Sequence, residues 1–116
     1  NNDFPKVLIG NWWDNISPEL LPKLFDEVEF RGWALEHAAI TETSMMMYFN
    51  PELVREELMG QEDFTPPNYQ IFPVPKTLVP SSGALYTGKS STAEKGRLIV
   101  ENVVENIVIF LNKEFS

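Results

Sequence analysis

The 116-residue sequence contains no cysteine and a single histidine, His37. Without cysteine, disulfide bonds, thiolate catalysis and cysteine-ligated zinc are excluded. Basic residues are also few, since nine Lys and Arg stand against seventeen Asp and Glu, for a net charge of -8. They are scattered and form no basic stripe that could follow a phosphate backbone. We therefore expect no nucleic-acid partner.

Long apolar runs are missing as well. No segment approaches the ~20 apolar residues of a membrane span. The first five residues have neither the basic start nor the apolar run of a signal peptide. We therefore expect no membrane association and a cytoplasmic location. With 43% hydrophobic residues, the chain is large enough for one core and too short for two ordinary domains.

The apolar and punctuating residues predict one strand and several helices. Val7-Leu8-Ile9-Gly10 is a short apolar run typical of a strand buried on both faces of a parallel sheet. Ser17-Pro18-Glu19 combines a cap residue, a first-turn proline and an acid, and predicts a helix over 18–26. Helices are also predicted over 38–49 and 50–59, and a short strand or turn over 83–88.

The last third of the chain predicts a long helix. Ser91-Thr92-Ala93-Glu94 matches a capping box, and the helix should extend to about Glu114. Apolar residues recur at helical spacing, and polar residues, Asn102 and Asn106 among them, lie towards the other side. We expect the apolar face to pack on a sheet, which makes the chain α/β. The apolar positions are Leu98, Val100, Val103, Val104, Ile107, Val108, Leu111 and Phe115.

A proline-rich segment over 60–82 separates these parts. It holds five of the nine prolines, interleaved with Phe64, Tyr69 and Phe72. Because large aromatic side chains need a surface to pack on, we expect an ordered, extended connection and not a flexible linker.

Residues 32–44 place His37 among carboxylates and an aromatic ring. An imidazole exchanges protons near neutral pH, and Glu36 or Glu42 could orient it or raise its pKa. A structural role for this histidine is the alternative. Metal ligation within this chain is not expected, because the spacing of these three residues matches no known ligand pattern and supplies an incomplete shell.

Three tryptophans accompany this segment. Trp12, Trp13 and Trp33 fall in predicted loops, where an aromatic ring can cover a planar ligand and exclude water. Packing in the core or at an interface is the alternative interpretation.

Several motifs, taken in order, resemble the C-terminal half of the creatinine amidohydrolase (creatininase) family. The resemblance spans about residues 6 to 115, and it includes the passages around Phe72-Pro73-Val74 and Pro80-Ser81-Ser82-Gly83. The motifs are Trp12-Trp13-Asp14, Gly32-Trp33-Ala34-Leu35-Glu36-His37, Glu42-Thr43-Ser44-Met45-Met46, Asn50-Pro51-Glu52-Leu53-Val54 and Ala93-Glu94-Lys95-Gly96.

This resemblance implies a fold, an activity and a partner. Residues 1–116 would form the C-terminal part of a single three-layer α/β domain with a mainly parallel sheet between helices. The family is commonly homohexameric, and its type member hydrolyses creatinine to creatine. Two divalent ions, zinc with manganese or magnesium, would be held by the N-terminal half, whose ligand motifs are absent here. This chain alone is therefore expected to hold no metal centre and to be inactive.

The resemblance also implies roles for individual residues. His37 matches the family's substrate-contacting, proton-transferring histidine, and Trp13 and Trp33 match tryptophans that close over substrate. Glu36 and Glu42 match flanking acidic positions with supporting roles.

One position departs from the family pattern. Ala34 stands where the creatinine-hydrolysing enzyme has an aspartate beside the substrate. This makes deformylation of a formamidopyrimidine nucleotide an alternative activity. A hypothesis of another class is a non-catalytic interaction module that binds a partner through its methionine and tryptophan surfaces.

Overall fold

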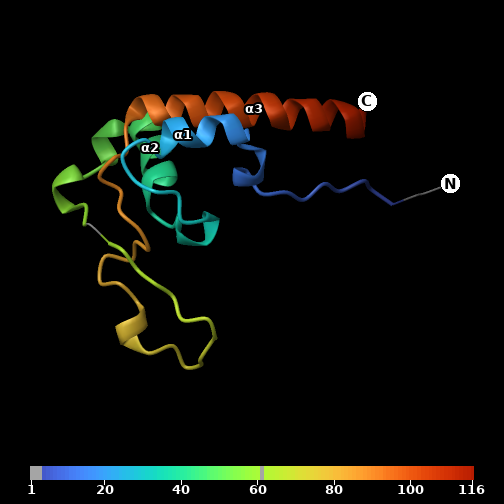
Figure 1. Cartoon of the computed structure of the whole chain (residues 1–116). Coiled ribbons are helices and arrows are strands. Elements are labelled where there is room, and N and C mark those ends of the chain that lie inside the picture. The colour runs from blue at the N-terminus through green and yellow to red at the C-terminus, as the bar shows by residue number, and fades with distance from the viewer. Residues whose placement is uncertain (1–3, 61) are drawn as a thin grey trace.

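The structure, a computed structural model, describes residues 4–60 and 62–116 and consists of helices joined by irregular segments (Figure 1). Its α-helices are α1 (Leu21–Leu24), α2 (Ile40–Phe49) and α3 (Ala93–Phe115). The long helix α3 forms one side of the molecule, and α1 and α2 lie against its N-terminal half. Six short 3-10 turns complete the described elements: η1 (Trp13–Asn15), η2 (Pro18–Leu20), η3 (Trp33–Leu35), η4 (Pro51–Leu53), η5 (Glu56–Leu58) and η6 (Lys76–Leu78).

The predicted α/β fold with a parallel sheet is wrong for this chain. In the described ranges no residue belongs to a β-strand, and a single antiparallel bridge joins Asp63 to Tyr86. The segment expected to be a buried strand is solvent-exposed, with Val7 73% and Ile9 93% accessible. A strand exists only through hydrogen bonds to a neighbour, and the described chain places no second strand beside this segment.

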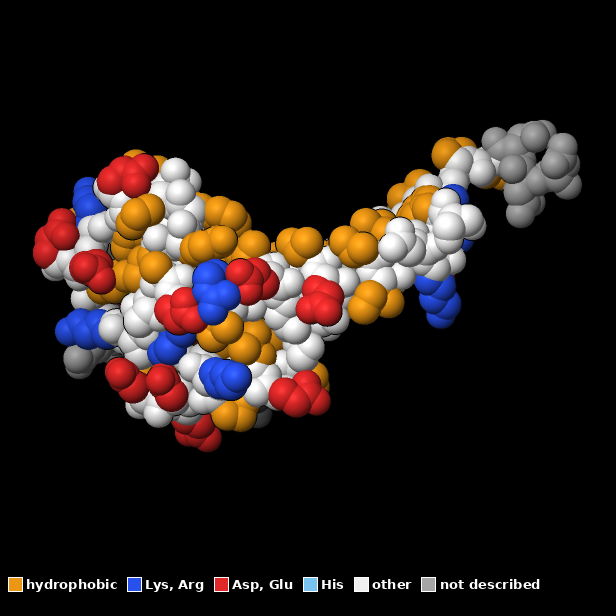
Figure 2. All heavy atoms as spheres, turned by 90° about the horizontal axis from the view of Figure 1, so that it is seen from above, with side chains coloured by type: hydrophobic (Ala, Val, Ile, Leu, Met, Phe, Trp, Pro, Cys, Tyr) orange, Lys and Arg blue, Asp and Glu red, His pale blue; other side chains and the backbone are white. Residues whose placement is uncertain are grey.

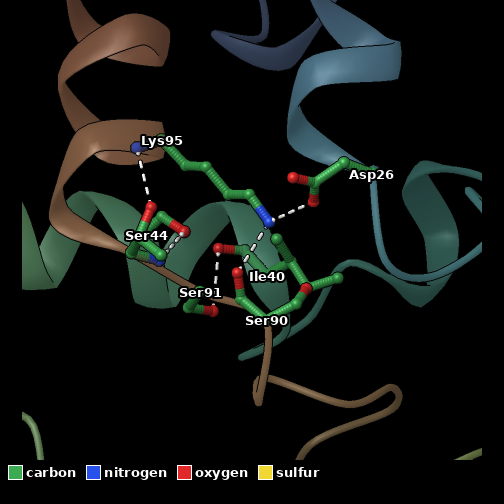
Figure 3. Close-up of polar contacts among 7 residues, drawn as sticks. Asp26, Ile40, Ser44, Ser90, Ser91 and Lys95 are labelled. Atoms are coloured by element: carbon green, nitrogen blue, oxygen red, sulfur yellow. Dashed lines mark hydrogen bonds and ion pairs between the residues drawn. The ribbon is translucent and has the colours of Figure 1, made fainter.

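The sequence predicted that α3 packs on a sheet, and this is wrong, because α3 packs on α2. The two helices approach closely at Gly96, where an added Cβ would lie 2.0 Å from the carbonyl oxygen of Ser44. Polar contacts fix the same crossing, because Ser44 Oγ accepts from the backbone of Thr92 at 3.2 Å and Ser91 Oγ donates to the carbonyl of Ile40 at 3.2 Å (Figure 3). The N-cap is Thr92, one residue after the expected Ser91, and its hydroxyl accepts from Lys95 N at 3.0 Å.

A buried lysine links this crossing to the end of the α1 segment. Lys95 is only 7% exposed, and its ammonium donates to Asp26 Oδ1 at 2.8 Å and to the carbonyl of Ser90 at 2.7 Å (Figure 3). The hydrogen bond from Lys95 holds the pKa of Asp26 below its usual value. The main apolar core lies nearby and consists of Ile16, Leu24, Ile99 and Val103.

Two predicted helices are shorter than expected. The predicted helix over 18–26 is the turn η2 followed by α1, which ends at Leu24. The predicted helix over 50–59 is the pair of turns η4 and η5. In the proline-rich segment only Phe64 packs against a buried cluster, whereas Tyr69 is 65% and Phe72 78% exposed. The packing expected for these two rings is therefore not observed.

The molecule is elongated, with extents of 53 × 38 × 27 Å. Residues 4–9 and 104–115 form a projecting arm, joined at its end by an ion pair between Lys6 and Glu114 at 3.0 Å. Apolar side chains follow this arm in Figure 2. Val104 is 54%, Val108 46% and Leu111 40% exposed, so the described chain does not cover these positions of the predicted apolar face of α3, whereas Ile107 packs against the main core. None of the helices within the described ranges has the length and apolarity needed to cross a membrane.

Candidate active site

The sequence-predicted histidine and tryptophans meet at a small hollow beside the first turn of α2. The hollow has a volume of about 160 Å³. This volume lies below the ~300–1,000 Å³ typical of ligand pockets, so the hollow by itself accommodates only a small molecule. The lining residues are Trp12, Trp13, Trp33, Glu36, His37 and Glu42.

Three tryptophan rings form one wall of the hollow. The ring of Trp12 packs edge-on against both of the others. Its centroid lies 5.7 Å from that of Trp13 and 6.4 Å from that of Trp33. Trp33 also packs edge-on against Phe30 at 4.9 Å. Trp12 and Trp33 contact the main core, and such edge-to-face contacts further restrict the rings. The wall is therefore held from behind and does not consist of free surface side chains.

Glu36 also lines the hollow and is 7% exposed. Its Oε2 accepts from the backbone N–H of Thr41 at 2.9 Å and from the Thr41 hydroxyl at 2.8 Å. Ala39, the N-cap of α2, makes no side-chain cap, so Glu36 satisfies a free N–H of the first helical turn. Burial raises the pKa of Glu36, and the two Thr41 hydrogen bonds oppose that rise. Glu36 is thus built into the loop that carries the histidine.

Glu42 holds the other end of the same loop. Its Oε2 accepts from the backbone N–H of Ala38 at 2.6 Å. Ala38 has a φ of 52°, a left-handed conformation that costs free energy in a residue with a Cβ and persists only where its surroundings enforce it. The carbonyl of His37 accepts from Leu85 N at 3.1 Å. The backbone on both sides of His37 is therefore fixed by hydrogen bonds.

His37 itself is exposed at the edge of the hollow. Among the hydrogen bonds and ion pairs of the described residues, none involves its ring. In this structure Glu36 and Glu42 bind the loop backbone and not the imidazole. The ring can thus accept or donate a proton to a molecule bound in the hollow, which is the chemistry that an imidazole provides near neutral pH.

The hollow does not fit a metal ion. Across residues 4–60 and 62–116 no group of three or more His, Asp or Glu side chains is arranged to hold one. One oxygen each of Glu36 and Glu42 is already bonded to backbone N–H groups. What the described residues offer is an imidazole beside three indole rings, without a group of side chains arranged to hold a metal ion.

The structure brings together five of the predicted site residues and leaves one apart. Ala34 is exposed in η3 and is not among the residues that line the hollow, so its contact with substrate stays a prediction. The sequence analysis did not identify Thr41, which donates to Glu36. The available signal was its position five residues after Glu36, where a side chain can cap the start of the following helix. The five that meet are Trp13, Trp33, Glu36, His37 and Glu42.

A larger pocket of about 440 Å³ adjoins the hollow. Ala38 lines this pocket, and Glu42 lines both cavities. The pocket is bounded mainly by apolar side chains such as Met46 and Leu58, with Arg55 as its basic residue. No ion pair among the described residues involves Arg55.

Comparisons with known proteins agree with the motifs around this hollow. The family model for creatinine amidohydrolase (creatininase) matches residues 4–111. Creatinine amidohydrolase from Pseudomonas putida is 35% identical over 112 residues, covering 95% of this chain and 43% of that protein. This chain thus spans less than half of that relative.

Solved structures give the same result. A mutant creatininase complexed with creatine has a TM-score of 0.89 and 35% identity, covering 95% of this chain and 44% of its own. A manganese form of creatininase has a TM-score of 0.90 and 35% identity, covering 95% of this chain and 43% of its own. On the family match and the sequence identity together, the chain belongs to the creatininase family.

Proposed function

We propose that this chain is the C-terminal part of a creatininase-like domain and works in an amidohydrolase that opens the cyclic amide of creatinine to give creatine. The observation that carries the proposal is the convergence of Trp13, Trp33 and His37 on one hollow with the volume of a small planar ring. A related creatininase has been solved with creatine, the product of this reaction.

The proposed roles follow from the chemistry of amide hydrolysis. Water adds to the carbonyl carbon, the C–N bond of the ring breaks, and the departing nitrogen takes a proton. His37 is the proton donor, since its ring makes no hydrogen bond to the described residues and lines the hollow. Trp13 and Trp33 cover the planar ring and exclude bulk water. Glu36 and Glu42 keep the histidine loop in place through their bonds to its backbone.

The proposal requires a companion segment, the N-terminal half of the same domain. Metal ions, zinc with manganese or magnesium, would be held by that half, because the described residues of this chain supply no metal shell. The exposed apolar side chains of the projecting arm, Val7, Ile9, Val104 and Ile109, are where we place its contact. We further propose a homohexameric assembly and a cytoplasmic location.

Reconstitution tests this proposal. The chain is mixed with a polypeptide comprising the part of the P. putida enzyme that it does not match, and native mass spectra and creatine formation are recorded. We expect a complex that contains bound metal and converts creatinine to creatine. A free 13.3 kDa chain without turnover, from a preparation whose circular dichroism shows it folded, would contradict the proposal and favour an interaction module.

A second candidate substrate is favoured by the adjoining pocket. Deformylation of a formamidopyrimidine nucleotide would place the formamide in the hollow and the nucleotide phosphate at Arg55. Side-by-side turnover of creatinine and a formamidopyrimidine nucleotide separates the two. If the nucleotide is the substrate, Arg55→Ala should raise its KM and leave creatinine turnover unchanged.

A further inference from the structure

Two asparagines on α3 contact residues 12–17, a segment that carries Trp12 and Trp13 and that we call the tryptophan turn. Asn102 Oδ1 accepts from the backbone N–H of Ser17 at 2.8 Å, and its Nδ2 donates to the Ser17 hydroxyl at 2.9 Å. Asn106 Nδ2 donates to the carbonyl of Asn15 at 2.8 Å and to Ser17 Oγ at 3.2 Å. Both side chains are half-buried. One face of α3 therefore binds three polar groups of residues 15–17.

These bonds act on the segment that carries two of the three wall tryptophans. The carbonyl of Trp12 accepts from Asn15 N at 3.1 Å, and that of Trp13 accepts from Ile16 N at 3.2 Å. Residues 12–17 thus form one short hydrogen-bonded turn that contacts α3. Because a 3-10 turn of three residues is weakly held by its own bonds, its orientation depends on what binds its end.

Helix α3 also fixes the other side of the hollow. Its first turns are attached to α2 through Gly96 and Ser44, and α2 begins next to the loop that carries His37. Two turns further along the same helix, Asn102 and Asn106 bind the tryptophan turn. Helix α3 therefore contacts both the turn that carries Trp13 and the helix that follows the His37 loop, in addition to the direct contact between Trp12 and Trp33.

We propose that Asn102 and Asn106 are positioning residues that hold Trp13 at the distance from His37 at which a planar ligand is bound. The part concerning ligand binding rests on the proposed function. The two asparagines touch neither the hollow nor its ligand. Their effect passes through Ser17 and Asn15 to the tryptophan turn.

The test begins with the 116-residue chain labelled with 5-fluorotryptophan. The ¹⁹F resonance of Trp13 is assigned with Trp13→Phe and compared among Asn102→Ala, Asn106→Ala and a matched control, Asn112→Ala, on an exposed part of the same helix. We expect the first two variants to shift and broaden the Trp13 resonance and the control to leave it unchanged. An unchanged Trp13 resonance in Asn102→Ala and Asn106→Ala would overturn the proposal.

Aspartate variants keep the test decisive where an alanine variant fails to fold. Asn102 uses its oxygen to accept from Ser17 N, and an aspartate retains that acceptor. Its second oxygen can accept from the Ser17 hydroxyl, which then donates where it accepted from Asn102 Nδ2. Towards the described residues the Asn106 side chain acts only as a donor, and an aspartate would set an acceptor against the carbonyl of Asn15. We therefore expect Asn102→Asp to resemble wild type and Asn106→Asp to disturb Trp13. Equal Trp13 resonances in the two aspartate variants would contradict this geometry.

Steady-state kinetics of the enzyme reconstituted with its companion segment separate positioning from a purely structural role. A purely structural role would not change KM selectively over kcat. Loss of one or two hydrogen bonds behind a ligand-contacting wall should raise KM for creatinine about five- to tenfold and leave kcat within about twofold. A fall in kcat at constant KM would contradict positioning of the wall. If wild-type enzyme does not hydrolyse creatinine, the proposed function fails, and the Trp13 resonance still decides the role of the asparagines.

Discussion

Thr41 donates two hydrogen bonds to a single carboxylate oxygen of Glu36, from its backbone N–H at 2.9 Å and from its hydroxyl at 2.8 Å. Both residues are buried, with Thr41 fully inaccessible. This contact joins the loop that carries His37 to the first turn of α2, on which Glu42 holds Ala38 from the other side. The histidine is thus presented by a segment whose conformation depends on two carboxylates.

Removing the Thr41 hydroxyl should weaken this segment. Thr41→Val keeps the side-chain shape and deletes one donor to a buried carboxylate, so we expect a loss of about 1–3 kcal/mol in the free energy of unfolding. The pKa of Glu36 should rise further, because that hydrogen bond favours the ionised form. Urea denaturation and NMR titration measure the two effects. Thr43→Val, which deletes a longer 3.4 Å bond to the carbonyl of Ala38, is the control, and an equal cost would contradict this assignment.

Glu36→Gln should change the pH dependence of stability. Burial holds the pKa of Glu36 in the folded state above its ordinary value, so folding favours the protonated acid. Its contribution to stability is fully present below the unfolded pKa and is lost as pH rises through the folded pKa. The stability of wild type relative to Glu36→Gln should therefore decline as pH increases from about 4.5. Denaturation at a series of pH values tests this, and a difference that grows with pH would contradict it.

Gly96→Ala should disrupt the crossing of α2 and α3. Alanine is the better helix former by about 1 kcal/mol, but its Cβ would lie 2.0 Å from the Ser44 carbonyl oxygen. Helix separation should then cost more than about 3 kcal/mol. The thermal unfolding midpoint measures this. Gly10→Ala is the control, since nothing lies within 4 Å of the added Cβ, and similar midpoints for the two variants would contradict the packing.

Local patterns were the predictable part of this molecule. The segment 32–44 places a histidine, a tryptophan and two carboxylates within a few residues, so their convergence needs only one loop and one helical turn. The length of α3 followed from its apolar spacing, and its cap was displaced by one residue, to Thr92. Short-range hydrogen bonding determines such features, and it can be read from neighbouring residues.

Features that depend on distant partners were not predictable. The sheet was inferred from Val7–Gly10, but a strand needs a neighbour, and the described chain provides none. The helical spacing of apolar residues in the outer part of α3 predicted a buried face, but this face is exposed. Such spacing identifies an apolar face and does not identify what covers it. Asn102 and Asn106 looked like solvent-facing residues, yet they bind residues 85 and 91 positions away. No sequence feature at Ser17 or Asn15 predicts their hydrogen bonds to Asn102 and Asn106.

The most direct test of the proposed active site is the activity of His37→Ala. The variant is reconstituted with the metal-bearing companion segment, and the rate of creatine formation is measured. Loss of a proton-transferring imidazole should lower kcat at least about a hundredfold. Metal content and the unfolding midpoint should stay at wild-type values, and added imidazole should restore part of the rate. Unchanged turnover in His37→Ala, with metal still bound, would contradict the role of this residue and with it the proposed active site.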